Sequence, residues 1–295
     1  MNCAPGNYSK DETSCYSKEQ LIKIAKALNE KQKTSIKTSG KTKKEIWDQI
    51  QKNLLGECIY EWCWLDNHAV KSIKDRKLKE EVFKPPMPDE WVKNKYTWLT
   101  TTDISKVMKQ YEKKYPEFHF YGPVPVDCPR DISCELTDLD LKRLSGRGIK
   151  YVGVIFNLDR HDQAGSHWVG LFCNIPKRVI SYYDSTATSP PDYIKYFIDM
   201  LKSSLKTING DRVIYNYNRK KHQFGGSECG VYSMNFIVES LRGKSIKDFE
   251  EKNISDYSVN ILREYFYRPS KKKMNSNLVK MGGKLRKKNV IYTNG

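Results

Sequence analysis

The sequence contains no run of about 18 apolar residues, the length that a transmembrane helix requires, so no membrane-spanning segment is expected. Its first residues show no basic stretch followed by an apolar one, which argues against a secretory signal and predicts a protein that is not secreted. No internal repeat is present. Hydrophobic residues nevertheless make up 38% and aromatic residues 12% of the 295 positions, which excludes a wholly disordered chain. The length suits one large domain or two smaller ones.

The eight cysteines lack the spacing of a metal site, because there is no Cys-x-x-Cys pair and no two cysteines lie near a close pair of histidines. A structural zinc site is therefore poorly supported. Without a secretory signal a disulfide framework is not expected either, since disulfides are rare in reducing compartments. We expect most of the cysteines to be unpaired thiols, and Cys229 to be the one whose surroundings differ.

Positive charge is in excess, with 52 Lys and Arg against 35 Asp and Glu, and the net charge of +17 favours contact with polyanions. Residues 1–55 hold 11 basic and 6 acidic side chains, and residues 268–295 hold 9 basic side chains and no acidic one. The long segment between them is close to neutral. The excess charge is therefore concentrated at the two ends of the chain.

Two helix starts mark the N-terminal part. Ser17 with Gln20, and Thr42 with Glu45, fit the capping box, and apolar residues follow each pair at helical spacing. The pattern predicts a helix–loop–helix unit that ends near Gly56. The unit resembles the SAP-like modules that often bind DNA, and lysines gather around its loop: Lys31, Lys33, Lys37, Lys41, Lys43 and Lys44. A basic surface that is merely solvated explains the same charges equally well, so both interpretations stay open.

A proline-rich connector, Lys84-Pro85-Pro86-Met87-Pro88, precedes a segment in which strand and helix patterns are mixed. The pattern at 230–241 is apolar nearly all round, as expected for a helix buried at the centre of a domain. Together these segments predict an α+β fold in which a helix packs on, or is inserted into, a largely antiparallel sheet. Strands are predicted at 149–156, 167–175, 178–184 and 212–218, and further helices around 104–111 and 189–208.

Cys229 has the surroundings of a nucleophile. It lies at the predicted start of the buried helix, whose N-terminal end stabilises a thiolate, the reactive form of cysteine. Glycines at 225, 226 and 230 would let a bound polypeptide approach the backbone closely. A neighbouring imidazolium would favour the thiolate further.

His167 and Asp184 are the candidates to act on that thiol. His167 opens one predicted strand beside Trp168 and Asp184 closes the next, so a hairpin of this length can place the two side chains together. His167 would then exchange a proton with Cys229 while Asp184 holds the imidazole in one tautomer. Gln223, six residues before Cys229, could donate with the Cys229 backbone N–H to an oxyanion. This chemistry needs no metal or organic cofactor. Trp168 is predicted either to cover the site or to be an ordinary core aromatic.

The order His-Trp, Asp, Gln and Cys resembles a clan of cysteine proteases, the SUMO-cleaving enzymes and the maturation proteases of adenoviruses, poxviruses and asfarviruses. The resemblance extends over residues 98–267 and includes Trp98-Leu99-Thr100 and Gly122-Pro123-Val124-Pro125. It is strongest toward the large-DNA-virus members, which join a helical N-terminal part to such a core. It implies an adenain- and SUMO-protease-like fold with a mixed sheet, a buried helix that carries the nucleophile, and Gln223 in the oxyanion hole. The implied division is a helical region at 1–84, a cysteine protease domain at 85–269 and a basic flexible tail at 270–295.

The same resemblance implies a thiol endopeptidase that cuts after Gly-Gly or a similar pair of small residues. Its expected place is the virion or the viral factories of the host cytoplasm, where it would process structural precursors during virion maturation. Two other functions stay open: an isopeptidase that removes SUMO or ubiquitin-like modifiers, and a catalytically inert protein that binds nucleic acid. The expected partners are protein substrates and, through the lysine-rich loop and the tail, DNA bound without sequence specificity. No membrane partner is expected.

Overall fold

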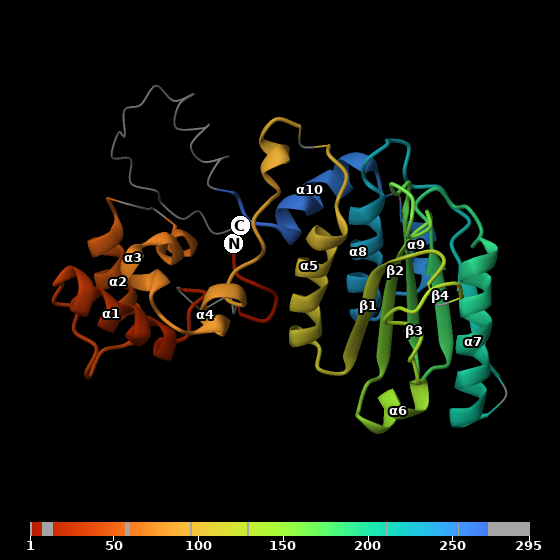
Figure 1. Ribbon diagram of the computed structural model, residues 1–295, viewed down its shortest axis with the longest axis horizontal. Helices are drawn as coiled ribbons and strands as arrows, with labels where there is room; N and C mark the ends of the chain where they lie inside the picture. Colours follow the sequence, from red (N-terminus) through yellow and green to blue (C-terminus); the bar gives the residue numbers. More distant parts are fainter. Residues whose placement is uncertain are drawn as a thin grey trace.

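The computed structural model describes residues 2–7, 14–56, 60–94, 96–128, 130–210, 212–252 and 254–270. A helical N-terminal unit lies beside a core in which helices cover both faces of one sheet (Figure 1). No helix in these ranges is long and apolar enough to cross a membrane. The predicted basic tail falls, apart from residue 270, outside the described residues. The N-terminal unit contains α1 (Lys18–Gln32), α2 (Lys43–Leu54), η1 (Glu61–Asp66), α3 (His68–Lys71) and α4 (Arg76–Glu80).

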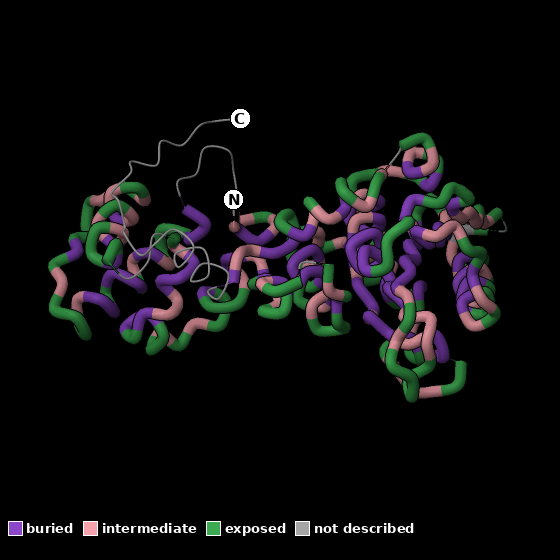
Figure 2. Tube along the Cα trace, turned by 90° about the horizontal axis from the view of Figure 1, so that it is seen from above, coloured by how far each residue is buried: buried purple, intermediate pink, exposed green. Residues whose placement is uncertain are grey.

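Both predicted capping boxes are present at the starts of α1 and α2: Ser17 pairs with Gln20, and Thr42 pairs with Glu45. The apolar faces of these helices join a hydrophobic cluster whose buried members come from residues 3–83. The clusters of the core begin at residue 87. Figure 2 shows buried segments in each of the two parts. We keep the division between residues 84 and 85 as a proposal.

The expectation that most cysteines are unpaired thiols is wrong, because five of the cysteines in the described ranges are disulfide-bonded: Cys3, Cys15, Cys63, Cys128 and Cys134. Disulfides join Cys3 to Cys15 and Cys128 to Cys134, with Cα–Cα distances of 5.2 and 6.0 Å. A disulfide forms only where folding brings two Cα atoms within about 7 Å of each other, and neither sequence spacing announces that proximity. Cys229 remains a free, buried thiol.

The core sheet has five strands in the order β1-β2-β3-β4-β5. β2–β3 and β3–β4 pair antiparallel, but β1–β2 and β4–β5 pair parallel. The sheet is therefore mixed, which confirms the fold class, whereas the expectation of a largely antiparallel sheet is wrong. The connections decide this, because α6 (Leu141–Gly146) and α7 (Asp192–Asn209) lie between the parallel partners and return the chain to the starting edge. The strands are β1 (Phe118–Pro125), β2 (Tyr151–Asn157), β3 (Trp168–Asn174), β4 (Val179–Tyr183) and β5 (Ile214–Tyr217).

The predicted buried helix is α8 (Cys229–Leu241), which packs on β3 and β2. It is covered by α5 (Thr101–Lys114) and α10 (Asp256–Phe266), while α7 lies on the opposite face of the sheet (Figure 1). Strand side chains alternate between the two faces, so Tyr183 joins the cluster on the α8 side and Tyr182 joins the other. The first residues of α8 lie on the same face of the sheet as Tyr183, and Ser233 of α8 is hydrogen-bonded to Trp168 at the start of β3. The core also contains η2 (Asp89–Val92) and α9 (Ile246–Glu251).

Arg268, which follows α10 near the end of the described core, contacts the N-terminal unit and the connector. The backbone N–H of Arg268 donates to the carbonyl of Pro85 at 2.9 Å. The Arg268 guanidinium lies 4.3 Å from the centre of a ring of Trp62, which belongs to the N-terminal unit. From α5, the side-chain amide of Gln110 donates to the carbonyl of Phe83 at 2.8 Å. The two parts are therefore joined by specific polar and cation–π contacts as well as by the connector.

Candidate active site

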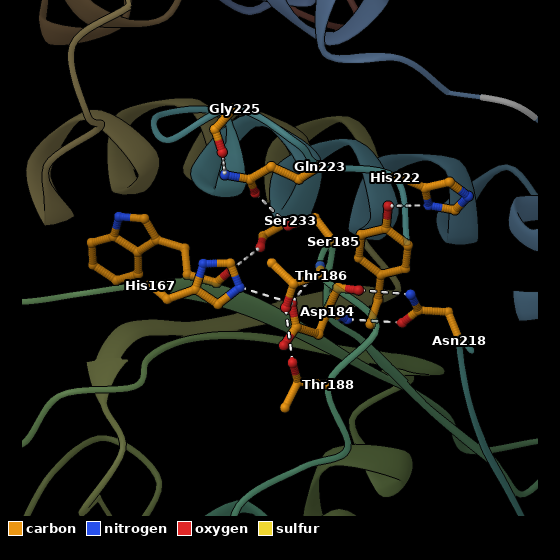
Figure 3. A network of polar contacts seen from close by, with 12 residues as sticks. His167, Asp184, Ser185, Thr186, Thr188, Asn218, His222, Gln223, Gly225 and Ser233 are labelled. Carbon is orange, nitrogen blue, oxygen red and sulfur yellow. Dashed lines mark hydrogen bonds and ion pairs between the residues drawn. The ribbon is translucent and has the colours of Figure 1, made fainter. Parts of the chain in front are cut away.

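His167 and Asp184 meet at one end of the β3–β4 hairpin. β3 begins directly after His167 and β4 ends directly before Asp184, and the strands pair antiparallel with Gly170 opposite Tyr183. His167 Nε2 donates to Asp184 Oδ1 at 2.8 Å (Figure 3). The structure thus brings together the two residues that the sequence predicts to be neighbours.

Asp184 is 1% exposed and is held by groups that sequence reasoning missed. Thr186 donates to Asp184 Oδ1 through its backbone N–H and its hydroxyl, each at 2.8 Å. The side-chain amide of Asn218 brackets the Asp184 backbone, because Nδ2 donates to the carbonyl oxygen at 2.6 Å and Oδ1 accepts from the N–H at 2.8 Å. Asn218 follows β5 as Asp184 follows β4, and parallel strands end at the same edge of a sheet. A polar residue directly after a strand was the signal that could have indicated Asn218.

Cys229 is the first residue of α8 and is 2% exposed, so the N-terminal end of the helix acts on its sulfur. With Nε2 turned to Asp184, Nδ1 is the ring nitrogen of His167 left for Cys229. Burial lowers the pKa of His167, but hydrogen bonding to Asp184 and to Cys229, and the charges of both groups, outweigh it and raise the pKa from 6.5 to about 9. The imidazole therefore carries its proton at neutral pH, beside the sulfur of Cys229.

Gln223 is 4% exposed and its amide is held in one orientation. Ser185 donates its hydroxyl to Gln223 Oε1 at 2.6 Å, and Gln223 Nε2 donates to the carbonyl of Gly225 at 3.0 Å (Figure 3). Nε2 carries two hydrogens, so one remains for another acceptor. The N–H of Cys229 opens a helix and has no carbonyl one turn earlier to bond within it. Both groups are thus suited to the predicted donation to an oxyanion.

Asp256, at the start of α10, fixes the segment between Gln223 and the nucleophile. Its Oδ2 accepts from the backbone N–H of Phe224 at 2.9 Å and of Gly225 at 2.8 Å. Its Oδ1 accepts from the hydroxyl of Tyr232, a residue of α8, at 3.1 Å. One carboxylate therefore ties the loop to both helices.

Arg263, 3% exposed, is the centre of a second buried network. Its guanidinium donates to the carbonyls of Ser227 at 2.8 Å and Thr97 at 3.0 Å, and its Nε donates to Asn260 Oδ1 at 2.9 Å. Asn260 donates in turn to Glu228 Oε1 at 3.0 Å. The residues directly before the nucleophile are consequently held through both backbone and side-chain atoms.

No helix was predicted from the sequence at α10, and none of these residues was assigned a role. Asp256, Asn260 and Arg263 are four and three residues apart, so they share one face of a helix. Polar residues at that spacing were the available signal. Their partners lie far away in the sequence, which is why the spacing alone gave them no role.

Trp168 packs against the start of α8. Its Nε1 donates to the carbonyl of Leu99 at 3.0 Å, and its own carbonyl accepts from Ser233 Oγ of α8 at 3.0 Å. A Cβ added to Gly230 would lie 3.1 Å from Leu99 and 3.2 Å from Trp168. The glycine after the nucleophile therefore makes room for these two side chains rather than, as predicted, for a bound polypeptide. Trp168 is both a core aromatic and a neighbour of the site.

A buried cysteine at a helix N-terminus, with a His–Asp pair beside it and amide donors in the preceding loop, is the arrangement of a cysteine protease. The fold places these groups on a mixed sheet with the nucleophile on a central helix.

Comparisons with known proteins agree with this class. Residues 147–278 match the model of the Ulp1 protease family, C-terminal catalytic domain. A protein of Acanthamoeba polyphaga mimivirus, named as a thiol protease, is 32% identical over 285 residues, which cover 91% of this chain and 94% of the relative. A cysteine protease of African swine fever virus is 26% identical over 251 residues, 78% of this chain and 90% of the relative. A crystal structure of the African swine fever virus protease matches with a TM-score of 0.63 at 20% identity, over 92% of this chain and 96% of that chain. The chain belongs to the Ulp1 protease family and is a cysteine protease.

Proposed function

We propose that this protease is an endopeptidase that cleaves after Gly-Gly or a similar small-residue site and processes viral structural precursors during virion maturation. The observation that carries the proposal is the extent of the similarity to the mimivirus protein, which covers 91% of the chain, whereas the family model covers only residues 147–278. The N-terminal helical unit is thus shared with a viral relative and is not part of the common catalytic domain.

In this proposal Cys229 attacks the carbonyl carbon of the scissile peptide as a thiolate. Gln223 Nε2 and the Cys229 N–H donate to the oxyanion that forms. Protonated His167 gives its proton to the leaving amine, the C–N bond breaks, and a thioester remains. Water, losing a proton to His167, hydrolyses the thioester and restores the thiolate–imidazolium pair. Asp184 keeps the imidazole oriented throughout.

The burial of the site supports a preference for glycine. Cys229 is 2% exposed and the His167 side chain is 17% exposed, while Trp168 and Leu99 pack beside the nucleophile. Only a thin stretch of polypeptide can reach a sulfur so enclosed. Residues without large side chains next to the scissile bond meet that requirement.

Internally quenched peptides that differ only at the residue directly before the scissile bond test the proposal. We expect a peptide with Gly-Gly-Ser to be cleaved, and replacement of the second glycine by alanine to lower kcat/KM at least about tenfold, more for valine. Equal rates for the three peptides would contradict the specificity. In the infected cell, virions that carry Cys229→Ala should accumulate uncut structural precursors, which mass spectrometry of virion proteins would detect.

Removal of ubiquitin-like modifiers is a second candidate, because the matched family is that of the SUMO protease Ulp1. Three substrates separate the candidates: a short Gly-Gly-Ser peptide, a linear fusion of a ubiquitin-like protein, and an isopeptide-linked conjugate. An endopeptidase cleaves the peptide efficiently. A deconjugating enzyme cleaves the conjugate at least about a hundredfold better than the peptide, because it depends on contacts with the folded modifier.

We also propose that the basic ends of the chain hold the protease on DNA, in the virion or in viral factories. Lys31, Lys33, Lys37 and Lys44 are exposed around the α1–α2 loop, and the thioester chemistry needs none of this charge. Binding should be independent of sequence and should weaken steeply with salt, because counterions are released. A gel shift with the chain lacking 270–295 should show weaker binding while peptide cleavage is unchanged. Unchanged affinity after removal of the tail and the four lysines would favour a merely solvated basic surface.

A further inference from the structure

A large apolar side chain projects into solvent directly beside the catalytic loop. Phe224, the residue after Gln223, is 78% exposed. Its backbone is nevertheless fixed, because its N–H donates to Asp256 at 2.9 Å and the next residue, Gly225, is bonded to the same carboxylate at 2.8 Å. An exposed aromatic on a rigid loop loses little conformational freedom when it is covered, which is a property of binding anchors.

Two further exposed apolar side chains lie on α10, the helix whose Asp256 binds this loop. Tyr257, adjacent to Asp256, is 78% exposed, and Ile261, one helical turn further, is 54% exposed. Phe224, Tyr257 and Ile261 are therefore exposed apolar side chains on two elements that Asp256 ties together. We call these three residues the rim patch.

The loop that leads to Phe224 is strongly basic. Arg219, Lys220 and Lys221 are consecutive and exposed, and Lys221 Nζ lies 5.0 Å from the centre of the Phe224 ring. In the described part of the chain none of the three side chains takes part in an ion pair. The carboxylates that face this loop are already engaged with its backbone, since Glu250 accepts from the N–H of Arg219 at 2.6 Å and Asp256 accepts as described.

We propose that Lys221 and the rim patch form a docking site for an acidic and apolar segment of the protein substrate, outside the residues at the scissile bond. Lys221 and Phe224 of this docking site are within two residues of Gln223 in the sequence. A substrate polypeptide that is bound at the active site therefore passes beside them. Positive charge next to exposed aromatics is complementary to carboxylates that alternate with apolar side chains. A second copy of this chain fits poorly, because its net charge is +17 and like charges repel.

This inference rests on the proposed endopeptidase function, and paired peptides separate the two. Each peptide carries the same Gly-Gly-Ser core, extended on one side or the other by Leu-Glu-Leu-Asp, by the neutral Leu-Gln-Leu-Asn, or by the basic Leu-Lys-Leu-Lys. For the wild type we expect kcat/KM to be about tenfold higher for the acidic than for the neutral extension on one of the two sides. In Lys221→Glu the basic extension should be cleaved with a higher kcat/KM than the acidic one. In Phe224→Ala the ratio of acidic to neutral kcat/KM should fall below about threefold.

Matched controls come from the far end of the β3–β4 hairpin and from α7. Lys177→Glu changes an exposed lysine in the turn opposite His167 and Asp184, and Tyr196→Ala removes an aromatic that is 46% exposed on α7. Both variants should keep the wild-type ratio. The proposal is overturned if the wild type shows no preference for the acidic extension, or if the preference survives in both Lys221→Glu and Phe224→Ala.

Binding keeps the inference testable even if none of the peptides is cleaved, which would count against the proposed function. In the Cys229→Ala background, fluorescence anisotropy of the labelled peptides should show tighter binding of the acidic extension and loss of that preference with Lys221→Glu. Equal affinities for the acidic and neutral peptides would overturn the docking site. If Lys221→Glu weakened binding of a short duplex DNA but left the peptide preference intact, the basic loop would be a DNA contact and the proposal would fall.

Discussion

The proton on His167 sets the upper limit of the pH range in which this protease should work. With a pKa of about 9, the imidazole loses its proton only in alkaline solution, and it can then no longer protonate the leaving amine. We expect kcat/KM for a Gly-Gly-Ser peptide to fall as pH rises through about 9, rather than near 6.5, the ordinary value for histidine.

The same shift makes stability depend on pH, and its sign follows from the direction. The folded pKa lies above the unfolded one, so protonated His167 stabilises the folded state. The contribution is complete below about 6.5 and is lost as pH rises from there through about 9. The difference between 6.5 and about 9 corresponds to about 3 kcal/mol, because one pKa unit is worth about 1.4 kcal/mol. Urea unfolding below and above this window should show the loss.

Asp184→Asn tests the cause of the raised pKa. Among the groups that raise the pKa of His167, Asp184 has the largest effect, so the alkaline limb of the profile should move to lower pH by at least about one unit. Asp192→Asn, on an exposed carboxylate of α7, is the matched control and should leave the limb in place. The reasoning would be refuted by a wild-type limb below about pH 8, or by a limb that Asp184→Asn does not move.

Cys229→Ala and His167→Ala should each abolish turnover, because nucleophile and base act as a unit; activity within about tenfold of the wild type in either would disprove their roles. Gln223→Ala should lower kcat by about a hundredfold with little change in KM, as measured on the Gly-Gly-Ser peptide. Asp184→Asn should lower kcat less than Asp184→Ala, because an amide can still orient the imidazole; equal losses would show that the charge is what matters. Asp256→Ala should lower kcat about tenfold through a displaced loop, and Asp256→Asn, which keeps one acceptor oxygen, should retain most of the activity. A rise in KM with kcat unchanged would contradict that positioning role.

Local pattern was sufficient for much of the fold. β2, β3, β4 and β5, the helices α5, α7 and α8, and the two capping boxes all follow from spacing and residue type. β1 did not, because Pro123 and Pro125 argue against a strand. It exists because it is an edge strand, paired with β2 alone, and its register shifts between Tyr121 and Val124.

What the sequence could not show depends on distant partners. His167 and Asp184 are joined by one hairpin, so their meeting could be predicted from chain direction. Asn218 and Arg263 have no such local relation to the groups they bind: Asn218 acts 34 residues from Asp184, and Arg263 donates to Thr97 across 166 residues. A buried polar side chain of this kind can be assigned only when its partner's position is known.

The closure of the core onto the N-terminal unit limits where this protein can be shortened for biochemical work. A fragment cut to the family match, residues 147–278, would lack β1 and α5, the Leu99 carbonyl that receives Trp168 and the Thr97 carbonyl that receives Arg263. A fragment that begins at the connector would keep those groups but leave Arg268 without Trp62 beneath it. α10 leads into Arg268 and also binds the loop before the nucleophile. We therefore expect the catalytic loop to be less well ordered in trimmed fragments, so that inhibitor screens on them would measure an altered active site. The chain from its first residues through Pro269 is the smallest piece on which such measurements should be made.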